Sequence, residues 1–192
     1  MNRSVMVLYI CNFVFIGMLP LSFFKRDGRF NLMWLLTSAP FFACSIFLFG
    51  ILFGLINPAE KIRSEWGTLL DIATVPFSVA SIALLCFTVG THRIPLALWH
   101  QTNDAPQHIV TYGPYRWVRH PFYVSFLLAL GGMFIYYPHL TTLITLSYGI
   151  VMLNGTADRE EKRLCGSEFG TEYADYMKRT GRFVPRWKGS TL

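Results

Sequence analysis

Long apolar runs separated by short charged segments dominate this 192-residue chain. Most runs approach the roughly 20 residues that an α-helix needs to cross the hydrocarbon core of a bilayer. The last run is too long for one crossing and is interrupted at Tyr136-Tyr-Pro-His139, so we divide it into a tight hairpin of two helices. The pattern predicts one all-α integral membrane domain, residues 1–192, with about five transmembrane helices. The predicted spans are 4–24, 31–56, 69–91, 121–137 and 139–156.

The segment after the last apolar run has a different, amphipathic pattern. Residues 158–185 are rich in charged and aromatic residues, and we expect a cytoplasmic helical tail there. Within it, Glu161–Arg179 is predicted to form an amphipathic helix that is broken near Phe169-Gly170. Earlier in the chain, Pro40 and Pro76 lie inside apolar runs, where they should kink a membrane helix without abolishing it.

Composition and charge agree with a membrane protein. Hydrophobic residues make up 53% of the chain and charged residues 15%, which is unusual for a soluble globular domain. Loops rich in Lys and Arg stay in the cytoplasm, and an outside N-terminus with an inside C-terminus leaves only Arg3, Lys61 and Arg63 outside. The net charge of +6 does not indicate a nucleic-acid partner, because no basic stripe with interleaved aromatic residues is present.

The four cysteines show neither CxxC nor Cys/His metal spacing, and three of them lie in apolar runs. We therefore interpret them as reduced, buried side chains and predict no metal site.

Two charged clusters bracket the final hydrophobic hairpin at its predicted cytoplasmic end. The first is Gly113-Pro-Tyr-Arg-Trp-Val-Arg-His-Pro-Phe-Tyr123, and the second is Asp158-Arg-Glu-Glu161. Pro121 suits the first turn of a helix, which places His120 near a helix N-terminus that attracts anions. The Glu160-Glu161 pair would favour a cation, and the aromatic faces of the cluster attract ammonium or sulfonium centres.

A ligand that carries both a carboxylate and positive charges would match these clusters. S-adenosylmethionine has a carboxylate, an ammonium and a sulfonium group, and methyl transfer from it depends mainly on positioning and on exclusion of water. Ionisable groups at a membrane helix end are functional candidates in their own right. The clusters therefore favour S-adenosylmethionine as cofactor.

The spacing of these motifs resembles a known enzyme family. The run Gly113-x-Tyr-x-x-x-Arg-His-Pro-x-Tyr123 precedes one hydrophobic hairpin and Glu160-Glu161. Phe169-Gly-x-Glu-Tyr-x-x-Tyr176 and Arg179-Thr-Gly-Arg-x-x-Pro185 follow. Together they resemble the isoprenylcysteine carboxyl methyltransferase family and, more loosely, the phospholipid N-methyltransferases. The resemblance covers about residues 89–185.

This resemblance implies an integral membrane methyltransferase whose cofactor site faces the cytoplasm. The small architecture favours a bacterial inner membrane as its location. The substrate would be a lipophilic small molecule or a lipid-modified molecule that enters among membrane lipids, with a carboxylate acceptor as in isoprenylcysteine O-methylation. The residues it assigns to the cofactor are Val110, Gly113, Tyr115, His120, Pro121, Tyr123, Glu160 and Glu161. It assigns Arg119, and as a second candidate Arg182, to positioning or neutralising an acidic acceptor.

The sequence leaves several alternatives open. The acceptor atom can be oxygen, nitrogen or sulfur, either glutamate can contact the cofactor's ammonium, and the oligomeric state is undetermined. A sterol-type membrane reductase that uses NADPH resembles the arrangement around Arg119-His120. A non-catalytic subunit whose basic inner face binds anionic lipids is a further alternative. Arg116 and Trp117 fit headgroup and interfacial anchors better than site residues.

Overall fold

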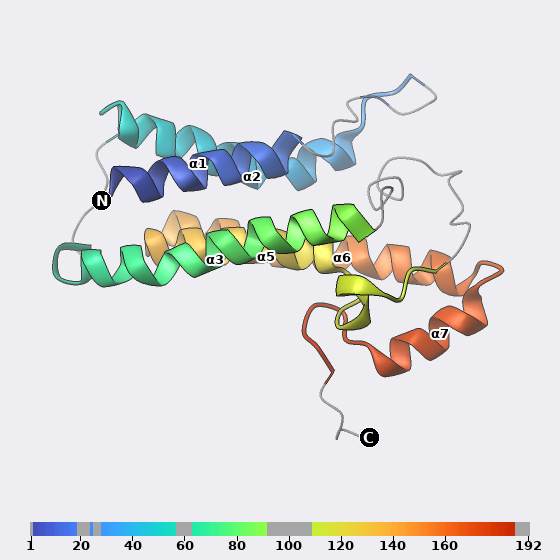
Figure 1. Cartoon of the computed structure of the whole chain (residues 1–192). Helices are drawn as coiled ribbons and strands as arrows, with labels where there is room; N and C mark the ends of the chain where they lie inside the picture. The colour runs from blue at the N-terminus through green and yellow to red at the C-terminus, as the bar shows by residue number, and fades with distance from the viewer. Residues whose placement is uncertain (1, 19–23, 25–27, 57–62, 92–108, 187–192) are drawn as a thin grey trace.

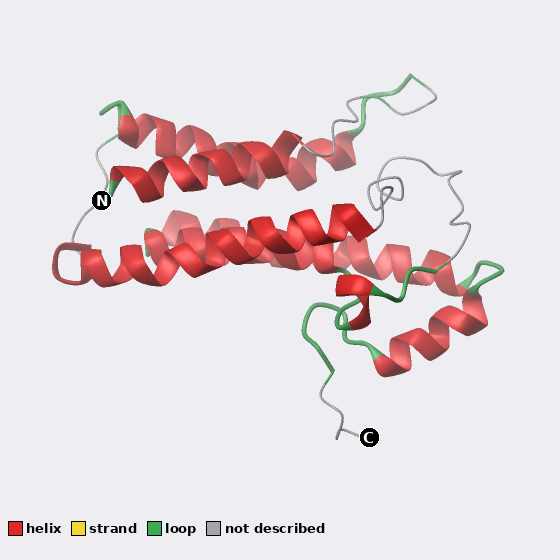
Figure 2. Ribbon diagram, viewed as in Figure 1, coloured by secondary structure: helices red, strands yellow, loops and turns green. Residues whose placement is uncertain are grey.

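The computed structural model describes residues 2–18, 24, 28–56, 63–91 and 109–186. Its helices are α1 (Arg3–Met18), α2 (Leu32–Leu52), α3 (Arg63–Thr91), the 3₁₀-helix η1 (Gly113–Arg116), α5 (Pro121–Tyr136), α6 (Leu140–Cys165) and α7 (Gly170–Arg179). Figure 2 shows helices and loops and no named strand in this described part. The predicted all-helical fold class is confirmed.

Each predicted span contains a helix, but the lengths differ from the prediction. Within the described residues, three stretches are long and apolar enough to cross a membrane: Trp34–Leu52, Glu65–Thr91 and Leu140–Cys165. α1 and α5 have 16 residues each, about 24 Å, against a hydrocarbon core of roughly 30 Å. The number of crossings therefore stays a prediction.

The two internal prolines lie inside continuous helices, as predicted. Pro40 lies within α2 and Pro76 within α3. Asn57-Pro58, the predicted end of the second span, and the polar segment Gln101–Gln107 lie outside the described residues.

α3 is the element around which α1 and α5 are packed. α3 packs along α5 and also contacts α1, while α1 packs against α2 and α6 against both α5 and α2 (Figure 1). From Thr74 onward, α3 has one fully buried face. Its residues follow a spacing of three and four: Thr74, Ser78, Ser81, Leu85 and Thr88. This spacing is that of one helix face.

Most of that buried face is polar, and its side chains bond to neighbouring helices. The hydroxyl of Thr74 donates to the carbonyl of Gly132 in α5 at 2.7 Å, and the hydroxyl of Tyr9 in α1 donates to the carbonyl of Thr74 at 3.0 Å. Ser81 donates to the carbonyl of Ser125 in α5 at 2.8 Å. Such bonds hold helices together in an apolar surrounding, where an unpaired polar group is costly. They fix α1 and α5 on α3.

The hairpin between α5 and α6 is closed by a helix cap. The ring Nδ1 of His139 accepts from the backbone N–H of Thr141 at 3.3 Å, and the hydroxyl of Thr142 accepts from the backbone N–H of His139 at 3.3 Å. A Cβ on Gly149 would lie 2.5 Å from Leu130 Cδ1, so this glycine lets α6 approach α5. The predicted tight hairpin is present.

α6 does not end where the apolar run ends. The sequence predicted a helical tail from residue 158, but α6 continues without a break through the charged residues to Cys165. No proline interrupts this stretch, and Gly155 is tolerated within the helix. Glu160 and Glu161 therefore lie on α6, the second helix of the hairpin.

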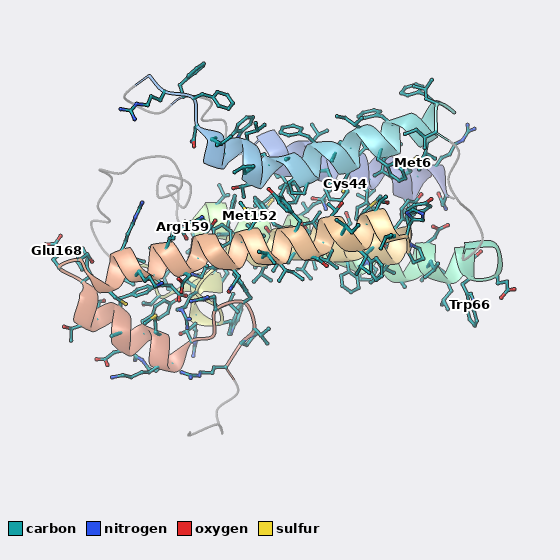
Figure 3. The ribbon with its side chains drawn as sticks, turned by 180° about the vertical axis from the view of Figure 1, so that it is seen from behind. Met6, Cys44, Trp66, Met152, Arg159 and Glu168 are labelled. Atoms are coloured by element: carbon teal, nitrogen blue, oxygen red, sulfur yellow. The ribbon has the colours of Figure 1, made fainter. Side chains whose placement is uncertain are left out.

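The predicted break near Phe169-Gly170 is confirmed: α7 starts at Gly170 and lies beside the last turns of α6 (Figure 1). In Figure 3, Glu168 at this turn and Trp66 near the start of α3 lie at opposite ends of the molecule. The charged cluster thus occupies one end of the bundle.

Candidate active site at the end of α5 and α6

A short backbone pairing brings the tail to the start of α5. The N–H of Arg119 donates to the carbonyl of Gly181 at 2.8 Å, and the N–H of His120 donates to the carbonyl of Arg182 at 3.2 Å. Val118 and Gly181 form a parallel bridge. A Cβ on Gly181 would overlap the carbonyl oxygen of Val184, so the tail turns tightly here. The pairing places the side chains of Arg119, His120 and Arg182 in one region.

The start of α5 leaves the imidazole of His120 available to α6. Pro121 occupies the first helical turn, as predicted, and His120 is the N-cap residue but makes no capping hydrogen bond with its side chain. The ring of His120 lies parallel to that of Tyr123, with centroids 5.3 Å apart, and meets Phe183 edge-on at 6.0 Å. These two contacts fix the plane of the imidazole.

Glu161 is the centre of an ion-pair network. Its Oε1 accepts from Arg119 Nε at 2.9 Å and lies 3.1 Å from His120 Nε2. Its Oε2 accepts from Arg182 Nη2 at 2.5 Å and from Arg182 Nε at 3.1 Å. Only 7% of the Glu161 side chain is exposed. Because two guanidinium groups bind one buried carboxylate, Glu161 is ionised.

Glu160 reaches the opposite side of the same imidazole. The hydroxyl of Tyr123 donates to Glu160 Oε1 at 2.6 Å, and Glu160 Oε2 lies 3.5 Å from His120 Nδ1. Adjacent residues on a helix point about 100° apart, which lets Glu160 and Glu161 flank one ring. The carboxylates therefore face the two different nitrogens of His120.

The imidazole of His120 is neutral near neutral pH. Burial is the main cause that lowers its pKa from the ordinary value, and the charges of Arg119 and Arg182 lower it further. The hydrogen bond with Glu161 opposes these effects without reversing them.

The two arginines also tie the tail to α6 and α7. Arg119 Nη1 donates to the carbonyls of Met177, at 3.3 Å, and Thr180. Arg182 Nη1 donates to Asn154 Oδ1 at 2.8 Å, and its Nη2 lies 3.4 Å from Asp158 Oδ1. The two guanidinium groups therefore hold the tail against α6 and α7 in addition to pairing with the charge of Glu161.

The remaining predicted site residues lie on the segment that leads to α5. The hydroxyl of Tyr176 in α7 donates to the carbonyl of Tyr115 in η1 at 2.6 Å. Val110 is buried. Gly113 has a φ of 61°, and a Cβ there would lie 2.7 Å from Thr91 Oγ1, so glycine is required. The roles predicted for Val110, Gly113 and Tyr115 toward a cofactor stay predictions.

The structure thus brings together the residues predicted to converge: His120, Tyr123, Glu160, Glu161, Arg119 and Arg182. Asn154 and Phe183 also belong to this cluster and were not predicted. Asn154, Asp158 and Glu161 share one face of α6 at a spacing of four and three residues, a signal that could have revealed Asn154. Phe183 carries no such signal. In the described residues, no group of three His, Cys, Asp or Glu side chains could hold a metal ion. The four cysteines are free, but the prediction that they are buried is wrong for three of them: only Cys44 is buried, whereas Cys11, Cys86 and Cys165 are exposed.

Comparison with known protein families finds a match for the middle of the chain. Residues 91–166 match the isoprenylcysteine carboxyl methyltransferase family, which confirms the resemblance seen in the motifs over that segment. This segment contains the first cluster, the hairpin and both glutamates.

Two curated relatives are bacterial resistance proteins. The cobalt-zinc-cadmium resistance protein CzcN of Cupriavidus metallidurans is 30% identical over 125 residues, which is 65% of this chain and 55% of that protein. The nickel-cobalt-cadmium resistance protein NccN of Alcaligenes xylosoxydans xylosoxydans is 27% identical over 125 residues, 65% of this chain and 56% of that protein. The match therefore spans about half the length of these relatives. No solved structure matches the chain.

Proposed function

We propose that this protein is an integral membrane methyltransferase that uses S-adenosylmethionine and acts on a lipophilic acceptor. One observation carries the proposal: His120, Tyr123, Glu160 and Glu161 meet in a buried cluster at the end of the hairpin, within the segment that matches the methyltransferase family. Buried ionisable groups in such a cluster are typical of functional sites.

The donor set fits the cofactor. The carboxylate of Glu160 suits its ammonium group, and the rings of Tyr115 and Tyr123 suit a sulfonium centre. Glu161 holds Arg119 and Arg182 beside the cluster. His120 orients Glu160 and Glu161 by contacting both. When bound, S-adenosylmethionine supplies the electrophilic methyl group. Burial of the cluster excludes water from it.

The acceptor in this proposal is a carboxylate carried on a lipophilic molecule. Arg119 and Arg182 are the cations nearest the cluster, and both are bound to Glu161. An acidic acceptor would therefore share a guanidinium with Glu161. A carboxylate is ionised near neutral pH and needs orientation only, without a dedicated base.

In the proposed topology five helices cross a bacterial inner membrane, with the cluster facing the cytoplasm. The three long apolar helices support a membrane location. The excess of basic residues on one side of the predicted spans supports the orientation.

Binding of labelled S-adenosylmethionine to detergent-purified protein tests the proposal. Glu161→Ala and His120→Ala should lose binding, whereas Glu168→Gln, at the exposed turn after α6, should retain it. Normal binding by both cluster variants would contradict the proposal. If NADPH protects the protein from thermal unfolding and S-adenosylmethionine does not, the reductase alternative is favoured. Mass spectrometry of a membrane lipid extract incubated with labelled methyl donor would identify the acceptor.

A further inference from the structure

The imidazole of His120 lies between two carboxylates, and this arrangement constrains the number of protons in the cluster. Nε2 lies 3.1 Å from Glu161 Oε1, and Nδ1 lies 3.5 Å from Glu160 Oε2. A neutral imidazole has one N–H group and one lone pair. It can therefore donate to only one of the two carboxylates.

The proton on Nε2 is assigned by the partners of Glu161. Two guanidinium groups donate to this carboxylate, so it is ionised and can only accept. Nε2 of His120 must then donate to Glu161 Oε1. The lone pair on Nδ1 faces Glu160, where an ionised carboxylate would be repelled.

We infer that Glu160 and His120 hold one shared proton in the ligand-free protein, and that this proton is released to solvent when the ammonium group of the cofactor binds at Glu160. The inference rests on the proposed function. In the ligand-free state Glu160 is the neutral carboxylic acid, with Oε2 facing Nδ1 across 3.5 Å, which leaves the buried pair without net charge. In the bound state an ionised Glu160 accepts from the ammonium instead.

The surroundings of Glu160 agree with this position of the proton. Its Oε1 accepts from Tyr123, which leaves Oε2 as the oxygen that carries the proton toward His120. Burial disfavours a charged imidazole and lowers the pKa of His120, so the proton belongs to the carboxyl oxygen. Among the described residues, the other charged or titratable groups around the pair are Arg119, Glu161 and Arg182, then Arg159 and Arg163 on α6, Tyr115 in η1, and Tyr173 and Tyr176 on α7.

Release of one proton links affinity to pH. Below the pH at which the free pair loses its proton, the affinity for the cofactor should rise about tenfold per pH unit, because binding requires deprotonation. Above that pH the affinity should become constant. The bond broken is O–H of Glu160, and the proton passes to the buffer.

Isothermal titration calorimetry of the full-length protein in detergent tests the inference. Titrations with S-adenosylmethionine in two buffers of different ionisation enthalpy, at a pH about one unit or more below the point where the affinity levels off, give the number of protons released. The wild type should release about one proton per cofactor. Glu160→Gln keeps a donor toward Nδ1 and an acceptor for Tyr123, so it should release none and bind with pH-independent affinity. Glu168→Gln removes an exposed carboxylate instead and should behave as the wild type.

Two further measurements strengthen the test. Tyr123→Phe removes the hydroxyl that stabilises the ionised form of Glu160, so the pH at which affinity levels off should move upward. S-adenosylhomocysteine keeps the ammonium but lacks the sulfonium charge, and it should also release a proton.

The outcomes separate the inference from the proposed function. Tight binding by the wild type without proton release, or release that persists in Glu160→Gln, would overturn the shared proton and leave the methyltransferase proposal intact. Release with S-adenosylmethionine but not with S-adenosylhomocysteine would overturn the assignment to the ammonium. If the wild type binds neither compound, the proposed function and this inference are both wrong.

Discussion

Replacing Glu161 by glutamine should destabilise the cytoplasmic end of the molecule strongly. The substitution keeps the shape of the side chain but removes the negative charge that binds Arg119 and Arg182. The Arg119 side chain is only 11% exposed, so its charge would be left buried without a partner. Removing one member of a buried ion pair costs about 3–5 kcal/mol, and we expect the lower end because the glutamine oxygen still accepts one hydrogen bond.

Truncation of Arg182 provides a graded comparison. Its side chain is 27% exposed, so solvent screens its charge in part. In Arg182→Ala, Glu161 keeps its bonds to Arg119 and His120. The loss should be about 1.5–2 kcal/mol, the low end of the range for a hydrogen bond to a charged group. The two variants should therefore differ by a clear margin, with Glu161→Gln the less stable.

Unfolding in detergent micelles, followed by tryptophan fluorescence, measures the order of stability. Limited trypsin digestion reports the local effect, because Lys178, Arg179 and Arg182 lie in the segment that the network holds. Faster cleavage there is expected in Glu161→Gln. Glu168→Gln serves as the control with an exposed carboxylate. A Glu161→Gln protein as stable as the wild type, or more stable than Arg182→Ala, would refute the reasoning.

Three further predictions concern other parts of the structure. Arg119→Lys keeps the charge but lacks the planar guanidinium whose separate nitrogens reach Glu161 and two carbonyls, so thermal unfolding should occur at a lower temperature and labelled cofactor should bind more weakly; unchanged values would show that only the charge matters. Gly181→Ala should accelerate trypsin cleavage of the tail, since its Cβ overlaps the Val184 carbonyl; normal protection would contradict the tight turn. Thr74→Val removes the hydroxyl that bonds the Gly132 carbonyl across α3 and α5 and should cost about 1 kcal/mol in micelle unfolding, whereas a neutral effect would argue against the polar face of α3.

The hydrophobic pattern was sufficient to predict the helical elements, because apolar runs of this length have few other stable forms in a membrane. It was not sufficient to predict their ends. α6 passes from apolar into charged sequence without a break, since charged residues such as Arg159 and Lys162 are themselves good helix formers. The composition changes at this point, but the backbone conformation does not.

The side chains that meet in the candidate site could be predicted from the sequence, but the backbone pairing that positions some of them could not. Cluster spacing around a hairpin was enough to bring His120 to Glu160 and Glu161. The pairing of Arg119 with Gly181 depends on main-chain groups, which every residue carries, so no side-chain pattern could reveal it. This pairing brings the second guanidinium, that of Arg182, to Glu161.

The two adjacent glutamates are suited to different tasks, and their hydrogen bonds decide which one is available to a ligand. Glu161 already accepts from Arg119, Arg182 and His120. An added cation would have to displace a bound guanidinium, or share the carboxylate with two like charges nearby. Glu160 accepts one hydrogen bond from the neutral hydroxyl of Tyr123 and otherwise faces His120. With the proton that we propose on the Glu160–His120 pair, a cation that approaches Glu160 displaces only that proton. Glu160 is therefore the carboxylate that we propose for the cofactor's ammonium group, while Glu161 holds Arg119 and Arg182 in place.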